Sequence, residues 1–100
     1  MRLTKEQVSI ISSTARSIFG DSVQVLLFGS RISDTRRGGD IDLLVQSADH
    51  TTLNLSNKLV FIVELKKRLG DQKIDVFLSR VDEDGSAVIQ TARKTGIALC

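Results

Sequence analysis

The sequence lacks a second cysteine, has only four aromatic residues, all of them phenylalanines, and contains no long apolar run. Cys100 is the last residue and cannot form an internal disulfide, which is compatible with a reducing compartment. The segment MRLTKEQVSIISSTARSIF carries polar residues every few positions, so it lacks the uninterrupted apolar stretch of a signal peptide or a membrane span. We therefore expect a cytoplasmic protein that is neither secreted nor inserted in a membrane.

The sequence also has little excess charge and no sign of a domain boundary. The formal net charge is +2, and the basic residues are spread along the chain rather than massed in a tract that would neutralise phosphates. Composition therefore gives no case for nucleic-acid binding, and the question stays open. No repeat, low-complexity stretch or linker divides the 100 residues, so we expect one domain, residues 1–100, without a separate substrate-binding domain.

Apolar periodicity and turn signals predict the order helix, strand, loop, strand, helix, strand, helix. A capping-box pattern, Thr4 followed by Gln7, starts the first helix. Asp84 or Ser86 could cap the last helix, which runs to Lys94 and precedes a short apolar tail, residues 97–99. The other bounds are 5–19 and 52–68 for helices, and 23–28, 40–45 and 73–78 for strands. This order predicts a small α/β or α+β fold, a mixed sheet with helices packed on it.

The second predicted helix has two possible apolar faces. Its helical stripe consists of Leu55, Leu59, Ile62 and Leu69. Its centre, residues 59–63, is five apolar residues in a row, which wraps well beyond one stripe. The sequence leaves open whether this centre faces the core or a partner protein.

The dipeptide Gly29-Ser30 follows the first predicted strand directly. A strand that leads into such a turn can point backbone N–H groups and the serine hydroxyl at an anion, and Gly29 removes the side chain that would block a phosphate. Alone, the dipeptide is more often a plain turn.

Three aspartates form a candidate metal site. Asp40 and Asp42 are two positions apart on one predicted strand, so they share a face, and the repulsion between them favours a divalent cation, Mg²⁺ or Mn²⁺. Asp75 interrupts a later apolar strand on the face that Ile74 and Val76 do not use. A bare Asp-X-Asp is usually a solvated strand start. Three carboxylates on neighbouring strands beside a phosphate-binding turn, however, are what two-metal phosphoryl or nucleotidyl transfer requires.

Residues 27–45, LFGSRISDTRRGGDIDLLV, together with residues 73–78, KIDVFL, resemble the signature of the DNA polymerase beta superfamily of nucleotidyltransferases. That signature is an apolar strand, Gly-Ser, a variable loop, Asp-apolar-Asp on the next strand, and a later strand with one Asp. Element order and length extend the resemblance to essentially the whole chain, as in the minimal members known as MNT domains. The resemblance implies a polymerase-beta-like nucleotidyltransferase fold.

The resemblance also implies roles for individual residues. Gly29 and Ser30 would hold the triphosphate of an NTP, with Arg31 as an auxiliary phosphate contact. Asp40 and Asp42 would bind both metal ions. Asp75 would help to bind one metal ion and would activate the acceptor hydroxyl.

Two positions depart from the pattern of many relatives. The run after Ser30 continues Arg31, Ile32, Ser33, Asp34, where relatives have a second glycine. Gly39 precedes the first metal-site aspartate, where relatives often have serine. The three aspartates are intact, so these departures concern the triphosphate-binding loop.

Two functions are therefore expected from different classes. The first is metal-dependent transfer of an NMP, with AMP from ATP as the expected case, to a hydroxyl. The resemblance implies a setting for it, because minimal members often act as the antitoxin of a small helical HEPN protein. The second is a non-catalytic module that neutralises a partner by occlusion. Homo-oligomerisation is compatible with both.

Overall fold

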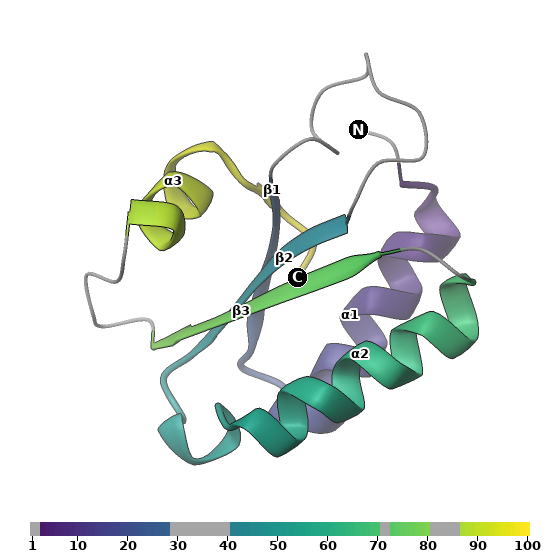
Figure 1. Ribbon diagram of the computed structural model, residues 1–100, viewed down its shortest axis with the longest axis horizontal. Helices are drawn as coiled ribbons and strands as arrows, with labels where there is room; N and C mark the ends of the chain where they lie inside the picture. The colour runs from purple at the N-terminus through teal and green to yellow at the C-terminus, as the bar shows by residue number, and fades with distance from the viewer. Residues whose placement is uncertain (1–2, 29–40, 71–72, 81–86) are drawn as a thin grey trace.

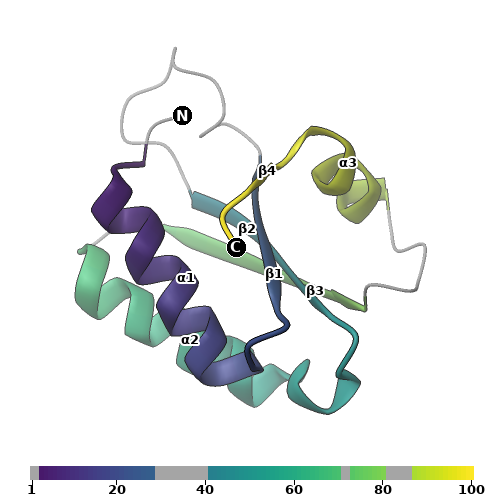
Figure 2. The same cartoon turned by 180° about the vertical axis from the view of Figure 1, so that it is seen from behind.

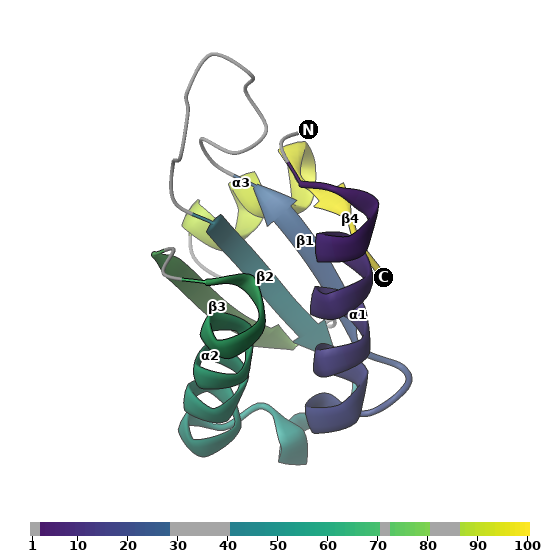
Figure 3. The same ribbon diagram turned by 90° about the vertical axis from the view of Figure 1, so that its right-hand side faces the viewer.

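The computed structural model of the protein describes residues 3–28, 41–70, 73–80 and 87–100. Within these ranges four strands form one sheet in the order β3-β2-β1-β4. Strand β1 pairs antiparallel with β2 and β4, whereas β2 and β3 are parallel, so the sheet is mixed as predicted. Helices α1 and α2 cover one face of the sheet, and α3 lies on the other (Figures 1 and 3). None of the helices in the described ranges is long and apolar enough to cross a bilayer.

Helix α1, Lys5–Phe19, begins and ends where its local signals predict. The backbone N–H of Gln7 donates to Thr4 Oγ1 at 3.0 Å, and the backbone N–H of Thr4 donates to Gln7 Oε1 at 2.9 Å. This reciprocal pair satisfies two donors at a helix start that would otherwise lack partners. Gly20 ends the helix with φ 101°, a conformation that favours glycine.

Successive side chains along each strand point to opposite faces of the sheet. Strand β1 is Gln24–Phe28, β2 is Ile41–Ser47 and β3 is Ile74–Arg80, each within two residues of its predicted bounds. The larger apolar core lies between the sheet and helices α1 and α2. From the strands it receives Val25, Leu27, Ile41, Leu43, Val45, Ile74 and Val76. A smaller cluster of Phe28, Leu44 and Ala92 lies beneath α3.

Helix α2, Leu55–Leu69, differs from the sequence prediction in two details. It begins three residues later than predicted, because Asn54 caps it and a short 3₁₀ helix, η2 (His50–Thr52), precedes it. Its buried side chains are Phe61 and Leu65, whereas the predicted stripe residues Leu55 and Leu59 are exposed. Five consecutive apolar residues give the helix more than one possible apolar face. The side that contains Phe61 and Leu65 faces the sheet, and the ring of Phe61 packs against the ring of Phe19.

The C-terminal segment contains a strand that the sequence did not reveal. Helix α3, Ala87–Thr95, is followed by Gly96 and by strand β4, Ile97–Ala98, which pairs with β1 (Figure 2). A Cβ atom at Gly96 would collide with the backbone carbonyl of Ala92 and crowd Leu26 Cβ at 3.1 Å. Between α3 and β4 the chain can therefore approach α3 and β1 this closely only with glycine at position 96. The residues predicted to cap this helix, Asp84 and Ser86, lie outside the described ranges.

We predict that Phe61→Ala lowers the free energy of unfolding by about 3–5 kcal/mol, because it empties a buried site. Phe61 is fully buried and packs edge-to-face on Phe19 with ring centroids 5.5 Å apart. Urea denaturation measures the loss. Val63→Ala, on the exposed side of the same helix, is the matched control and should change stability by less than about 0.5 kcal/mol. Equal losses in the two variants would show that α2 does not pack as described.

Candidate active site

The described part of the candidate site is one row of residues across the sheet. Asp42 pairs with Phe28 on its antiparallel side and with Asp75 on its parallel side. Neighbouring strands lie about 4.8 Å apart, and paired residues of neighbouring strands point to the same face, so the two carboxylates lie side by side. Both aspartates are half-buried. Ile41 N donates to Lys73 O at 2.9 Å, immediately beside this row.

The face that carries these carboxylates is organised in three successive rows. The acidic row, Phe28, Asp42 and Asp75, is followed by an apolar row of Leu26, Leu44 and Phe77 and then by a polar row of Gln24, Gln46 and Ser79. The rings of Phe28 and Phe77 lie 5.6 Å apart and link the first row to the second. The carboxylates are therefore bordered on the sheet by packed apolar side chains.

Arg93 of α3 binds the polar row. Its Nε donates to Gln46 Oε1 at 3.0 Å, and its second guanidinium nitrogen donates to Ser79 Oγ and Arg80 O, both at 2.8 Å. Gln46 Nε2 in turn donates to Gln24 Oε1 at 2.9 Å. This network fixes α3 over the same face of the sheet that carries the two aspartates.

Four of the predicted site residues fall outside the described ranges. They are Gly29, Ser30, Arg31 and Asp40. Gly29 follows Phe28 directly in the chain, and Asp40 precedes Ile41 directly. The structure therefore brings together Asp42 and Asp75, and the predicted roles of all six residues stay predictions.

The described carboxylates suit a divalent cation. Like charges on paired strand positions repel, and carboxylate oxygens are the ligands that Mg²⁺ and Mn²⁺ prefer. No group of three or more His, Cys, Asp or Glu side chains gathers in the described residues. The third predicted ligand, Asp40, lies outside them. The donor set that is described, two oxygen ligands on one face, fits a magnesium-type ion.

Residues 8–95 match the profile of a family described as nucleotidyltransferase domain. The chain belongs to this family. The match and the small mixed sheet confirm the predicted polymerase-beta-like fold, and they make the protein a transferase enzyme with an NTP as substrate class. No curated protein matches the chain.

Sequence reasoning missed Arg93 and the aromatic neighbours of this nucleotidyltransferase site. No motif in the sequence around Arg93 indicates its role, because its hydrogen-bond partners lie 13 to 47 positions away. The one available signal was the recurrence of polar residues at Gln24, Gln46 and Ser79 inside apolar strands. Of these, Gln46 and Ser79 are buried, and buried polar side chains require a hydrogen-bonding partner from elsewhere in the fold.

We predict that Arg93→Met destabilises the protein by about 1.5–3 kcal/mol. The substitution removes hydrogen bonds from a charged group and leaves buried acceptors without their guanidinium donor. Ser79 and Gln46 are both buried. Urea denaturation measures the loss, and amide hydrogen exchange should show faster exchange in α3. Lys94→Met changes the exposed neighbouring cation and serves as the control. If both variants lose the same small amount, Arg93 does not hold α3 on the sheet.

Proposed function

We propose that this nucleotidyltransferase transfers an NMP, specifically AMP from ATP, to a hydroxyl group of another molecule, and that the reaction requires Mg²⁺ or Mn²⁺. The observation that carries the proposal is the parallel register of β2 and β3, which sets Asp42 beside Asp75 on one face. The sequence adds Asp40 one position before β2 and Gly29-Ser30 one position after β1. Adjacent carboxylates beside a phosphate-binding turn are the arrangement that this chemistry uses.

Each predicted residue has a defined role in this proposal. Asp40, Asp42 and Asp75 hold the cations. Gly29 and Ser30 bind the triphosphate through backbone N–H groups and a hydroxyl, and Arg31 adds a cation near the phosphates. Binding at these positions aligns the α-phosphorus of the nucleotide with the acceptor oxygen, which removes much of the entropic barrier.

The chemical step breaks a phosphoanhydride bond of the nucleotide and forms a phosphoester bond to the acceptor. The acceptor hydroxyl oxygen forms a bond to the α-phosphorus, and the bond from that phosphorus to the oxygen bridging to the β-phosphorus breaks. Asp75 takes the hydroxyl proton, and the bridging-bond electrons leave with pyrophosphate. When bound, the divalent cations neutralise charge that develops on the phosphate oxygens.

The proposed setting is a cytoplasmic toxin–antitoxin pair. In it the chain acts as the antitoxin of a small helical HEPN-type protein and modifies a hydroxyl of that partner. This setting follows from the resemblance to minimal nucleotidyltransferases. The alternative is neutralisation by occlusion without turnover, and its support is the altered run Ile32, Ser33, Asp34 after the Gly-Ser pair. We propose the 100 residues as one minimal domain in either setting.

We predict that Asp42→Asn and Asp75→Asn each lower AMP transfer about a thousandfold, because each removes a charge that holds the cations and so several kcal/mol of transition-state stabilisation. The assay uses α-labelled ATP with Mg²⁺ and the purified partner. Asp21→Asn, at an exposed turn after α1, removes an equal charge away from the site and should leave transfer unchanged. Full activity in Asp75→Asn would contradict the proposal.

Removal of divalent cations should abolish transfer in the unaltered protein. Excess EDTA is expected to stop label incorporation, and added Mg²⁺ or Mn²⁺ is expected to restore it, because neither cation is bound irreversibly by carboxylates at a solvent-accessible site. Denaturation curves with and without EDTA check that the fold persists. Transfer that continues undiminished in EDTA would exclude metal-dependent chemistry.

The same variants separate the two proposed modes of neutralisation. If neutralisation of the HEPN partner is lost together with label transfer in Asp42→Asn and Asp75→Asn, modification is the mechanism. If neutralisation survives both substitutions while the variants still bind the partner, occlusion is the mechanism.

A further inference from the structure

An unusual share of exposed apolar surface lies on helix α2. Leu55 is 66% exposed, Leu59 52%, Val63 51% and Val60 47%. Leu55, Leu59 and Val63 follow one another at four-residue intervals, so they form a line along the helix, and Val60 lies beside that line. We call these four residues the α2 crest. Within the described ranges, only Val88 and Ile97 are comparably exposed large apolar residues elsewhere, so the crest is a patch rather than ordinary scatter.

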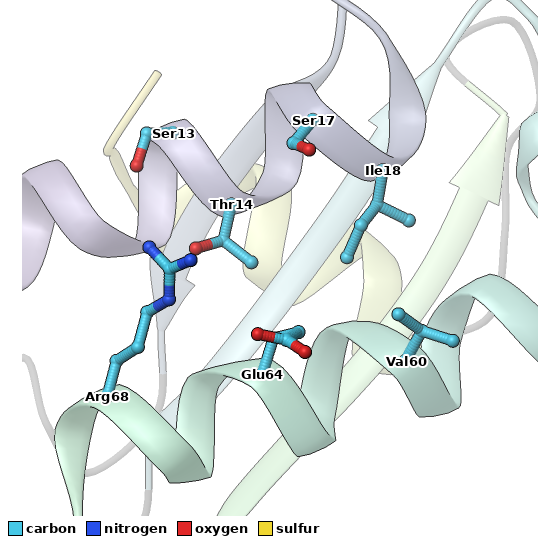
Figure 4. A pocket seen from close by; sticks show the side chains of 7 residues that line it. All are labelled: Ser13, Thr14, Ser17, Ile18, Val60, Glu64 and Arg68. Carbon is cyan, nitrogen blue, oxygen red and sulfur yellow. The ribbon is translucent and has the colours of Figure 1, made fainter.

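A groove between α1 and α2 adjoins the crest at Val60 (Figure 4). Its volume is about 480 Å³. On the α1 side it presents side-chain hydroxyls, and the side chains of Glu64 and Arg68 point toward α1 from the other side (Figure 4). The lining residues are Ser13, Thr14, Ser17, Ile18, Val60, Glu64 and Arg68.

One hydroxyl of this groove has no hydrogen-bond partner among the described residues. Thr14 is 5% exposed, and its Oγ1 atom is buried without a partner. A buried hydroxyl without a hydrogen bond costs free energy that a bound group or an ordered water can recover. The groove therefore contains unused hydrogen-bonding capacity next to an exposed apolar patch.

The charges around the crest favour an acidic occupant. Lys66, Lys67 and Arg68 are exposed at its C-terminal end. Glu64 is the acid that lines the groove, and Lys67 Nζ lies 3.5 Å from its Oε1 atom. The surface thus combines apolar contacts with positive charge, and complementary charge at the rim of an interface sets partner choice and association rate.

The same charges disfavour a second copy of this chain as the occupant. An antiparallel pair of α2 helices would place the three basic residues against the positive N-terminal end of the other helix. A parallel pair would place them against the same three cations. Both arrangements juxtapose like charges, so the crest suits a chain of different composition.

We propose that the α2 crest and the adjoining groove bind an amphipathic helix of a partner protein that carries apolar side chains flanked by carboxylates. The apolar side chains cover Leu59 and Val63, and a carboxylate reaches Arg68 at the mouth of the groove. Helix α2 covers one face of the sheet (Figure 3). The two aspartates belong to the opposite face, because they alternate along β2 and β3 with the residues that pack toward α2. A partner seated there leaves that face open, so the proposal does not depend on the proposed transfer reaction.

The test uses two matched synthetic peptides and the full chain without nucleotide. Each peptide is an amphipathic helix of about 20 residues with one leucine seam, long enough to be partly helical in water. One peptide carries glutamates beside the seam, and the other carries lysines at the same positions. Fluorescence anisotropy should show the acidic peptide binding at least about tenfold more tightly at low salt, with the difference shrinking at about 1 M salt.

Substitutions locate the binding surface. Leu59→Glu should weaken the acidic peptide about tenfold or more, because it places a charge in the apolar contact. Arg68→Gln should weaken binding of the acidic peptide and should not weaken binding of the lysine peptide. Val88→Glu changes a comparably exposed apolar residue on α3 and should have no effect on binding. Because Leu59 is exposed, Leu59→Glu should retain the denaturation midpoint of the unaltered protein.

Three kinds of outcome would overturn the proposal. Absence of binding by the acidic peptide is the first. Equal binding of both peptides, or binding that Leu59→Glu does not weaken, is the second, since it would indicate unspecific adhesion. The third is a concentration-dependent dimer in sedimentation that Leu59→Glu dissociates, because a second copy would then cover the crest.

Discussion

The parallel pairing of β2 with β3 is the constraint on which the functional arrangement depends. It aligns Asp42 with Asp75, and a shift of the register by one residue would turn one carboxylate into the packed core. The pairing is held by apolar residues that point to the other face, where Ile41, Leu43 and Val76 are buried between the sheet and two helices. Core packing on one face thus positions the charged pair on the opposite face.

The two faces of the sheet therefore have separate tasks. One face, covered by α1 and α2, supplies most of the buried apolar contacts that stabilise the fold. The other carries the acidic row, and α3 is held over it through Arg93. A sheet divided in this way can keep two repelling carboxylates together, because their repulsion is opposed by apolar contacts that do not involve them.

Local signals in the sequence were sufficient to predict α1, the three longer strands and the face on which Asp75 lies. A capping box, short apolar runs and period-two alternation act within a few residues and identify such elements. The exposed side of α2 was not predictable, because five consecutive apolar residues fit several orientations and the choice depends on Phe19. Strand β4 and the partners of Arg93 arise from contacts distant in sequence, which no local pattern encodes.

In the proposed reaction, Asp42 and Asp75, aligned by the β2–β3 pairing, jointly ligate a divalent cation. Crystals of the protein with Mn²⁺ and a non-hydrolysable ATP analogue would test it through the anomalous signal of manganese. We expect an anomalous peak with carboxylate oxygens of both residues about 2 Å away. A peak bound elsewhere in the molecule, with these two carboxylates contacting only protein and water, would contradict it.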